Sequence, residues 1–417
     1  MFGQPDPFVV IAGNGLAGSA LACLLLDRGF GVLFLTRRAG LRSSPVIEAF
    51  PQATVRLFAE VGLGESLAEA GSVAVAGFDN GYGDRRRMDG WWLHVDRRRL
   101  DRACYVATRR RGAAAMPADG SRPAAFAFVD ATGRAARWSR PVARAHPCVT
   151  ALFAGPGAAE AVAGRVVRMG AGWAYRLAHP DGTTVGVTGP AGHGPRLDER
   201  VASDLGLADL DRLVPVGRRP ASVQWSKDPI GVGRLAVGDA ALAYSPLAGQ
   251  GVRFALASAQ AAAAVLSTWR DGDVSLGREY YRSFVDQARR RHLAKIEAIA
   301  NEGEPAAPPP GINPEAHLAF TAVTCDVPMN VGGRVRRGPA CLLPDGGQVR
   351  WVGGFDLLSL REAVDQGETV AGTCRALERA AVPGPLALVA WAVRTGVLTC
   401  EEAPVTHPGE VAAPLRR

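Results

Sequence analysis

The sequence has 417 residues, of which 47% are hydrophobic, and this length and composition predict an ordinary globular protein of about two or three domains. Its formal net charge is +8, and nearly all of the positive charge is arginine, because Lys227 and Lys295 are the only lysines. The arginine excess is typical of a GC-rich genome, although attraction of an acidic cofactor or partner is an alternative explanation. The few aromatic residues are not interleaved with the basic clusters, so we expect no binding to nucleic acid.

Cysteine usage and the first hydrophobic stretch bear on location. The seven cysteines form no C-x-x-C pair, which argues against a disulfide framework or a zinc site; we expect no metal and a reducing, cytoplasmic compartment. Residues 8–26 are uncharged and long enough to suggest a membrane span. No basic segment or A-x-A cleavage site accompanies them, and their three glycines fit a strand, a turn and a helix better. We therefore expect no membrane span and no signal peptide.

The hydrophobic pattern predicts a mixed α/β order of elements. Residues 7–12 and 31–36 are short buried strands around a helix at 15–29, the crossover unit of a parallel sheet. The other predicted elements are helices at 51–70 and 97–111, a loop at 113–124, a strand at 125–130, antiparallel strands within 164–190, a strand at 234–238, and helices at 250–269 and 276–300. A proline-rich linker at 301–314 precedes a unit at 315–417 with helices at 358–365, 368–382 and 385–396.

A glycine-rich turn follows the first strand and opens the first helix. Gly13, Gly15 and Gly18 match the pattern G-x-G-x-x-G. The first glycine permits a tight turn, the second lets the backbone approach a pyrophosphate, and the third lets the helix pack on the strand. The start of the helix, with Leu16 and Ala17, offers free N–H groups and a positive dipole end to the phosphates.

The end of the second strand departs from the usual dinucleotide pattern. Thr36 stands where an acidic residue normally hydrogen-bonds the ribose. A threonine hydroxyl could still bind the ribose, and Arg37 or Arg38 could stack on adenine or reach a phosphate. The alternative is that both arginines are solvated surface residues.

A second motif far along the chain distinguishes between cofactors. It comprises Gly238 and Asp239, then Pro246, then the run Gly249, Gln250 and Gly251. This segment resembles the G-D-A-x(6)-P-x-x-G-x-G segment of the large FAD-dependent monooxygenase and halogenase superfamily. The resemblance implies that the aspartate binds a hydroxyl of the FAD ribityl chain. It also implies that the proline lies beside the isoalloxazine ring, with the glycines and the following helix near its pyrimidine edge.

Weaker matches to the same superfamily occur in the family's order between these two motifs. They are the segments 47–51 with Glu48, 94–101 with Arg97 as an FAD contact, and 129–134 near the adenine side. The resemblance covers about 8–300. It implies an α/β, FAD-binding Rossmann-like fold of the group A flavin monooxygenase type, with an antiparallel β substrate region at about 140–225. A small, mainly helical, winged-helix-like C-terminal domain would follow.

Within this superfamily the sequence argues against halogenation. Halogenases place an essential lysine in the first half of the chain, but no lysine precedes Lys227, and their W-x-W-x-I-P segment is degraded at 173–178. Hydroxylation through a flavin C4a-hydroperoxide, with NAD(P)H as transient reductant, is the remaining expectation. Glu48 is the candidate polar group near the ring and Pro246 the flavin-adjacent residue. A structural role for Glu48 stays open, and His94 and His179 are further candidates for a general base.

Two features bear on the substrate. The interval between 111 and 125 is too short for extra strands, which predicts a trimmed sheet and an open active site. The C-terminal order of strand and helices is similar to small winged-helix, peptide-recognition domains, although a structural cap or a dimerisation element is the alternative. Together they resemble the flavoprotein monooxygenases that mature tryptophylquinone enzymes such as quinohemoprotein amine dehydrogenase. The resemblance implies a tryptophan of a partner polypeptide as substrate; a small aromatic metabolite, or a reductase or dehydrogenase reaction, remains open.

Overall fold

The computed structural model describes most of the chain and divides it into two units. The described residues are 8–36, 46–81, 86–118, 123–139, 141–145, 147–157, 164–170, 172–192, 195–207, 209–246, 249–301, 312–352 and 354–401. The first unit comprises Met1–Pro305 with Asn330–Val335, and the second comprises Ala306–Met329 with Arg336–Arg417. Most of the predicted linker, 302–311, lies outside the described residues.

A six-stranded sheet forms the centre of the first unit, in the order β15-β16-β7-β1-β2-β6. Its strands are β1 (Phe8–Ala12), β2 (Gly31–Thr36), β6 (Ala114–Pro117), β7 (Ala127–Asp130), β15 (Ile230–Gly231) and β16 (Arg234–Ala236). β1 pairs in parallel with both β2 and β7, which confirms the predicted crossover unit. The prediction of a loop throughout 113–124 was wrong, because β6 pairs in parallel with β2. Its sequence, Ala-Ala-Met-Pro, has low strand propensity, so only the neighbouring strand organises it.

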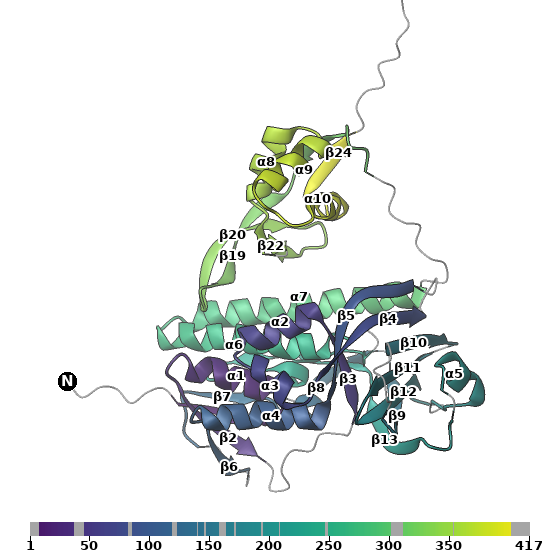
Figure 1. The fold of residues 1–417 in the computed structure, drawn as a ribbon. Coiled ribbons are helices and arrows are strands. Elements are labelled where there is room, and N and C mark those ends of the chain that lie inside the picture. Colours follow the sequence, from purple (N-terminus) through teal and green to yellow (C-terminus); the bar gives the residue numbers. More distant parts are fainter. Residues whose placement is uncertain are drawn as a thin grey trace, which may run out of the picture. The chain divides into compact units, whose positions relative to one another are not determined.

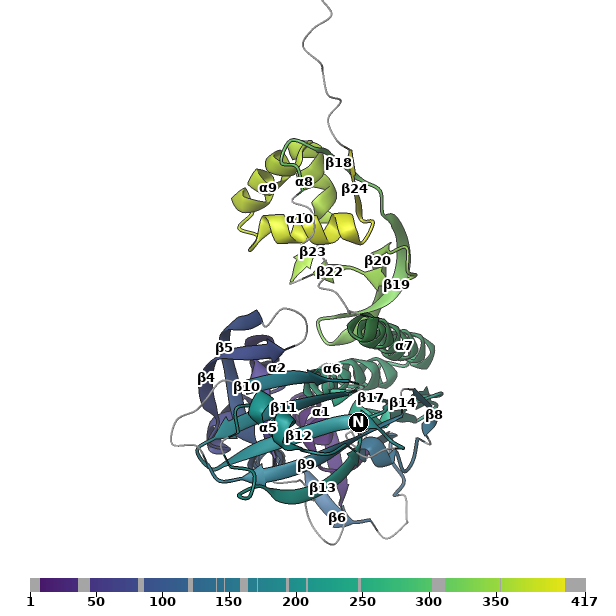
Figure 2. The same cartoon turned by 90° about the vertical axis from the view of Figure 1, so that its right-hand side faces the viewer.

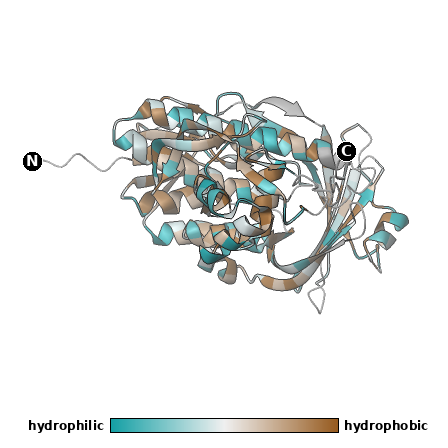
Figure 3. Cartoon of the chain, turned by 90° about the horizontal axis from the view of Figure 1, so that it is seen from above, coloured by the Kyte–Doolittle hydropathy of each residue, from teal (hydrophilic) through white to brown (hydrophobic). Residues whose placement is uncertain are grey.

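Helices cover this sheet and bury its apolar strands. They are α1 (Leu16–Leu26), α2 (Gln52–Glu60), α3 (Gly64–Glu69), α4 (Arg97–Arg110), α6 (Gly251–Arg270) and α7 (Val274–Asn301) (Figure 1). Small residues on α1 and α6 let these two helices pack closely, and both contribute to the main core. Hydrophobic and polar residues are interspersed along the helices (Figure 3). The uncharged segment 8–26 is therefore a strand, a turn and a short helix, and no helix among the described residues is long and apolar enough to span a membrane.

A larger sheet of eight strands forms the other part of the first unit, in the order β13-β9-β12-β11-β10-β4-β5-β3 (Figure 2). Its strands are β3 (Ile47–Pro51), β4 (Val73–Gly81), β5 (Arg86–Asp96), β9 (Cys148–Gly155), β10 (Gly164–Met169), β11 (Gly172–His179), β12 (Gly182–Pro190) and β13 (Val214–Pro220). The sheet thus starts well before residue 140, where the β substrate region was expected. It is also not purely antiparallel, because β10 pairs in parallel with β4.

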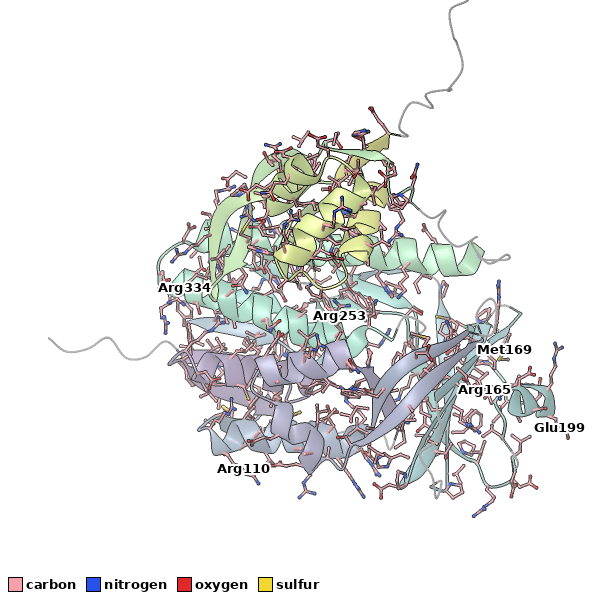
Figure 4. All side chains as sticks on the ribbon, turned by 45° about the horizontal axis from the view of Figure 1, so that its top comes forward. Arg110, Arg165, Met169, Glu199, Arg253 and Arg334 are labelled. Carbon is pink, nitrogen blue, oxygen red and sulfur yellow. The ribbon has the colours of Figure 1, made fainter. Side chains whose placement is uncertain are left out.

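One face of this large sheet is covered by α5 (Glu199–Asp204). Ala174, Val185 and Val187 on the strands pack with Val201 and Leu205 in a small apolar cluster. Figure 4 shows Glu199 on α5 near β10, the strand that carries Arg165 and Met169. Because side chains alternate along a strand, the neighbours of Ala174, Val185 and Val187 in sequence lie on the opposite face.

The other elements of the first unit connect the two sheets. A three-stranded sheet is formed by β8 (Pro141–Ala145), β14 (Val223–Ser226) and β17 (Leu242–Ala243), and two 3₁₀ helices are η1 (Gly133–Ala135) and η2 (Gly238–Ala240). In this sheet β14 pairs with both β8 and β17, so the segment after β13 is tied to the segment after η2.

The second unit has its own apolar core, centred on three helices. Its elements are β18 (His317–Phe320), β19 (Val323–Val331), β20 (Arg334–Leu342), β21 (Gln348–Val349), β22 (Trp351–Val352), β23 (Phe355–Asp356), α8 (Ser359–Gly367), α9 (Val370–Arg379), α10 (Pro385–Arg394) and β24 (Leu398–Glu401). The three predicted helices are therefore present, although strands make up more of this unit than expected. The tip of the β19–β20 hairpin belongs to the first unit, where the Val335 N–H donates to Thr268 Oγ1 at 2.8 Å.

Candidate active site

The glycine turn between β1 and α1 has the geometry that the sequence predicts. Gly13 has a φ of +110°, and a Cβ there would lie 2.3 Å from the carbonyl oxygen of Ala131. A Cβ on Gly18 would lie 2.2 Å from the carbonyl oxygen of Gly13. Both contacts are with backbone, so only glycine fits at either position.

Gly15, the middle glycine, differs from the other two. A Cβ there would meet no protein atom within 4 Å, so the space beside it is open. Gly15 is also the residue that caps α1, and among the described residues no side-chain cap hydrogen bond occupies the start of the helix. The N–H groups of that turn and the positive end of the helix therefore face an open space, as a pyrophosphate requires.

The second motif lies directly on the start of α1. Gly238 has a φ of +59°, and a Cβ there would lie 2.8 Å from the Cβ of Ala17. The Gly238 N–H donates to the Ser258 hydroxyl on α6 at 2.9 Å, which fixes η2 between the two helices. Two segments far apart in the sequence thus meet at the start of α1, while Leu16 is buried in the core beneath them.

Asp239 lies in η2 beside the glycine turn, and the partly open space at its carboxylate is called the cleft below. Its side chain is 35% exposed, yet desolvation raises its pKa, while the nearby guanidinium groups of Arg134 and Arg97 lower it. A carboxylate that protein surrounds but water still reaches is accessible to a ligand. Its position next to the glycine turn suits a hydroxyl-bearing chain that extends from a bound pyrophosphate.

Arg134 connects the segments that form this cleft. Its guanidinium donates to the carbonyl oxygens of Ser222 and Tyr244, and Asp239 Oδ2 lies 3.6 Å from its Nε. Its own carbonyl oxygen accepts a hydrogen bond from Gln224 Nε2 at 2.9 Å. The sequence indicates the segment 129–134 as a family motif but predicts no role for this arginine. Its position at the end of the motif is the signal that could have identified it.

Asp130, which begins the same segment, has a structural role. Its carboxylate accepts hydrogen bonds from the N–H and hydroxyl of Thr132, the N–H of Trp138 and the hydroxyl of Ser139, at 2.6–3.0 Å. These bonds fold the loop after β7 into one shape. The loop in turn supplies the Ala131 carbonyl oxygen that requires glycine at position 13.

The residues just before Pro246 are fixed by contacts with α7. Tyr244 stacks on His292, with ring centroids 4.0 Å apart, and the Ser245 N–H donates to His292 Nε2 at 2.9 Å. Pro246 itself is exposed, as is Gly249. This arrangement presents the exposed part of the loop to a ligand while its base stays rigid.

The glycines after Pro246 lead into α6. Gly249 has a φ of +59°, and its N–H donates to the Pro246 carbonyl oxygen at 3.0 Å. Gln250 caps α6, which begins at Gly251, and Figure 4 marks the start of this helix by Arg253. Residues 247–248, between the proline and the glycines, lie outside the described residues.

Glu48 and Arg97, predicted separately as site residues, form one ion pair. Arg97 Nη1 donates to Glu48 Oε1 at 2.9 Å and to Oε2 at 3.0 Å, and Arg97 Nε donates to Asp101 at 2.9 Å. Burial opposes the charge of Arg97, but Asp101 and Glu48 outweigh it and raise the pKa. The arginine therefore stays charged, and its expected contact with FAD stays a prediction.

The predicted alternative bases, His94 and His179, are buried and bind backbone. The Nδ1–H of His94 donates to the carbonyl oxygen of Ala178 at 2.7 Å, and burial lowers its pKa. The Nε2–H of His179 donates to the Gly71 carbonyl oxygen at 2.9 Å. His94 links β5 to β11, His179 links β11 to the turn before β4, and both rings are buried, which favours a structural role.

The ribose end of the site is only partly described. The Thr36 hydroxyl donates to the Met116 carbonyl oxygen at 3.4 Å. The hydroxyl that the sequence predicts for the ribose is therefore bonded to β6. Arg37 and Arg38 lie outside the described residues, and their expected contacts with adenine or phosphate stay predictions.

Comparison with protein families agrees with this geometry. The sequence profile of the FAD binding domain family matches residues 7–117, the segment that holds β1, the glycine turn and α1. The chain carries an FAD-binding domain. The residues fit the cofactor: an open glycine turn for the pyrophosphate and a carboxylate in an adjoining cleft for the ribityl hydroxyls. When bound, FAD supplies the redox chemistry, and the protein supplies binding and orientation.

Several solved structures of flavin-dependent monooxygenases and halogenases have a fold similar to that of this chain. The peptidyl tryptophan dihydroxylase QhpG, essential for tryptophylquinone cofactor biogenesis, is 21% identical with a TM-score of 0.68, over 94% of this chain and 100% of that one. The flavin-dependent halogenase CmlS is 16% identical with a TM-score of 0.69, over 96% and 97%. PqsL, a probable FAD-dependent monooxygenase from Pseudomonas aeruginosa, is 18% identical with a TM-score of 0.56, over 72% and 96%. No curated protein matches the chain by sequence.

The family match confirms the predicted FAD-binding domain and FAD as the cofactor, and the solved structures, which are flavin-dependent monooxygenases and halogenases, confirm the predicted α/β fold. At such low identities the solved structures inform on the fold alone. The extent of the matches is still informative. The matches to QhpG and CmlS cover 94% and 96% of this chain, which is more than the first unit alone contains. The arrangement of an FAD-binding unit followed by a second unit is thus shared with QhpG and CmlS.

Proposed function

We propose that this FAD-dependent enzyme is a monooxygenase that hydroxylates an aromatic side chain, a tryptophan, of a partner polypeptide during quinone cofactor biogenesis. In the overall reaction NAD(P)H, a proton and O₂ convert a ring C–H into C–OH, with NAD(P)⁺ and water as the other products. The observation that carries the proposal is a face of half-buried aromatic side chains on the large sheet. This face is connected through Glu48 and Arg97 to the cleft at Asp239.

The aromatic face lies on the side of the sheet that α5 does not cover. Phe78 packs on Trp92 with ring centroids 4.8 Å apart, and its ring lies over Gly164, where a Cβ would be 2.4 Å away. Tyr175 lies over Gly186 in the same manner, and Trp173 is two residues earlier on the same strand. Half-buried aromatic rings suit an aromatic substrate, because such rings pack well on one another.

The second unit supports a polypeptide as the substrate. A groove of about 600 Å³ lies between β18 and α8, with Arg361, Asp365 and Glu368 among its lining residues. A charged groove beside a strand edge suits an extended peptide. QhpG, which acts on a peptidyl tryptophan, shares the fold over nearly the whole chain, including this unit.

Halogenation is disfavoured although CmlS has a similar fold. No lysine precedes Lys227, and Tyr175 stands at the second tryptophan position of the halogenase segment. The second candidate function is hydroxylation of a small aromatic metabolite, which the same aromatic face would serve. A reductase or dehydrogenase reaction would use the same FAD site, but the aromatic face would then have no role.

Isotope labelling tests this proposal. The purified enzyme with FAD is incubated with NADH or NADPH under ¹⁸O₂, with tryptophan-containing polypeptides in one set of reactions and phenol or indole in another. We expect mass spectrometry to find ¹⁸O on one aromatic side chain of a polypeptide. Label found only in the small molecules would support the metabolite alternative, and flavin turnover without ¹⁸O in any product would exclude a monooxygenase.

A further inference from the structure

We propose that Tyr175 is the residue that positions the substrate ring, by accepting a hydrogen bond from the ring's N–H or O–H group. The inference rests on the proposed function, because it concerns an aromatic substrate at the face described above. It adds a requirement that the fold alone does not impose: the substrate ring must carry a hydrogen-bond donor. An indole N–H and a phenol O–H both meet this requirement.

The backbone of the sheet holds Tyr175 in an unusual position. Tyr175 is paired with Gly186 on β12, and a Cβ on Gly186 would lie 2.2 Å from its Cε1 and 2.6 Å from its hydroxyl oxygen. The phenol therefore lies flat over β12, in space that exists only because residue 186 is glycine. It is on the face opposite Ala174, which packs toward α5.

The hydroxyl of Tyr175 has no hydrogen-bond partner among the described residues, although the side chain is half-buried. Desolvation raises its pKa, the carboxylate of Glu48 raises it further, and Arg219 lowers it. The phenol thus stays protonated at neutral pH. A half-buried hydroxyl that the described part of the chain leaves unbonded is a feature that a bound substrate can satisfy.

The charge of Glu48 determines how the hydroxyl can be used. Arg97 binds both oxygens of Glu48, so this carboxylate is fixed in place. A fixed negative charge attracts the hydroxyl hydrogen toward itself and leaves the lone pairs of the tyrosine oxygen pointing elsewhere. Tyr175 consequently presents an acceptor to the substrate, which selects a ring that donates.

The neighbouring aromatic side chains would hold the ring but not orient it. Trp173 lies on the same face as Tyr175, and the Phe78–Trp92 pair lies along the same sheet. Stacking contacts tolerate rotation of a ring in its plane, whereas one hydrogen bond fixes which ring carbon faces the flavin. The specificity for position then depends on a single hydroxyl group.

Binding of two tryptophan analogues tests the role of Tyr175. The probes are N-acetyltryptophanamide and the same compound methylated on the indole nitrogen, and the readout is the change in the visible absorption of the bound flavin. The proteins are the wild type, Tyr175→Phe, and Tyr105→Phe as a matched control, because Tyr105 packs on Phe34 away from this face. We expect the wild type and the control to bind the unmethylated probe about tenfold more tightly than the methylated probe.

Tyr175→Phe should bind both probes with the affinity that the wild type has for the methylated one, with unchanged flavin content. A preference that persists in Tyr175→Phe would show that the methyl group acts by its size, and would overturn the inference while leaving the proposed function intact. Equal binding of the two probes to the wild type would overturn it as well. If neither probe changes the flavin spectrum of any of the three proteins, the aromatic substrate itself is refuted, and the inference with it.

Discussion

Two pairs of glycines show how differently this molecule builds its cofactor turn and its aromatic face. At the cofactor turn, a Cβ on Gly13 or Gly18 would lie 2.3 or 2.2 Å from a carbonyl oxygen of the backbone. On the large sheet, a Cβ on Gly164 or Gly186 would lie 2.4 or 2.2 Å from the ring of Phe78 or Tyr175. The distances are alike, but the first pair meets backbone and the second meets side chains.

The difference matters because backbone atoms and side-chain atoms differ in how easily they can move to make room for an added Cβ. A backbone carbonyl held in a turn cannot move without disturbing the strand and helix that it joins, whereas a ring can rotate about its side-chain torsions. Glycine at the turn is therefore a condition for the fold. Glycine on the sheet is a condition for where an aromatic ring lies, and so for the substrate site that we propose.

Gly18→Ala should have the largest effect. The added Cβ would meet the Gly13 carbonyl oxygen, so the helix must move off the turn, and we expect a loss of about 2–3 kcal/mol of folding free energy together with the flavin. Chemical denaturation and the flavin content after purification measure the two effects. Gly15→Ala is the matched control: with open space beside residue 15, the apoprotein should keep its stability while FAD affinity falls. If both variants lost stability equally, the contrast between the two positions would be refuted.

Asp239→Asn should have an intermediate effect, on the cofactor only. Because burial raises the pKa of Asp239, the folded state disfavours its ionised form, and stability of the wild-type apoprotein should fall as the pH rises through that pKa. The asparagine variant lacks this dependence, so its apoprotein should be at least as stable as the wild type at neutral pH. FAD affinity should fall by about tenfold or more, since a charged hydrogen-bond acceptor is lost.

Thermal unfolding of both apoproteins across the acid-to-neutral range, with FAD titration by fluorescence, measures these changes. A variant apoprotein that is clearly less stable than the wild type at neutral pH would show that Asp239 serves the fold rather than the cofactor. Unchanged FAD affinity would show that the carboxylate does not face the cofactor.

The same contrast explains what could be predicted from the sequence. The glycine turn was predictable because its three glycines are close in the chain and each satisfies a local condition, and the Gly238–Asp239 segment was predictable for the same reason. The ion pair of Glu48 and Arg97 was not, although both residues were named. Only the antiparallel pairing of β3 with the end of β5 brings Glu48 to the start of α4.

Two other features escaped prediction because local signals were weak or interrupted. The β4–β5 hairpin contains a bulge between Ala76 and Phe78, with Gly77 at a φ of +72° and Gly90 at +110°, which disrupts the alternation of apolar residues. In the sequence, Tyr175 only marks a departure from the halogenase segment. Its position over Gly186 depends on a pairing between strands that no spacing in the sequence reveals.

Gly186→Ala should have the smallest effect on stability and a specific effect on the site. The new Cβ would displace the Tyr175 ring, which can rotate away, so we expect a loss of about 1 kcal/mol in folding free energy and normal flavin content. In a Tyr175→Ala background the same substitution should cost nothing, because the ring it displaces is gone. Gly189→Ala on the same strand is the control, since its Cβ would meet Pro195 at an ordinary 3.6 Å.

A double-mutant cycle of Gly186→Ala and Tyr175→Ala, measured by chemical denaturation, isolates this contact from all others. A coupling free energy near zero would mean that Gly186 is glycine for a reason other than the ring. A coupling of about 1 kcal/mol, with Gly189→Ala neutral in both backgrounds, would show that the residue opposite Tyr175 is small in order to set where the phenol lies. The choice of substrate would then depend on a glycine that touches neither the flavin nor the substrate.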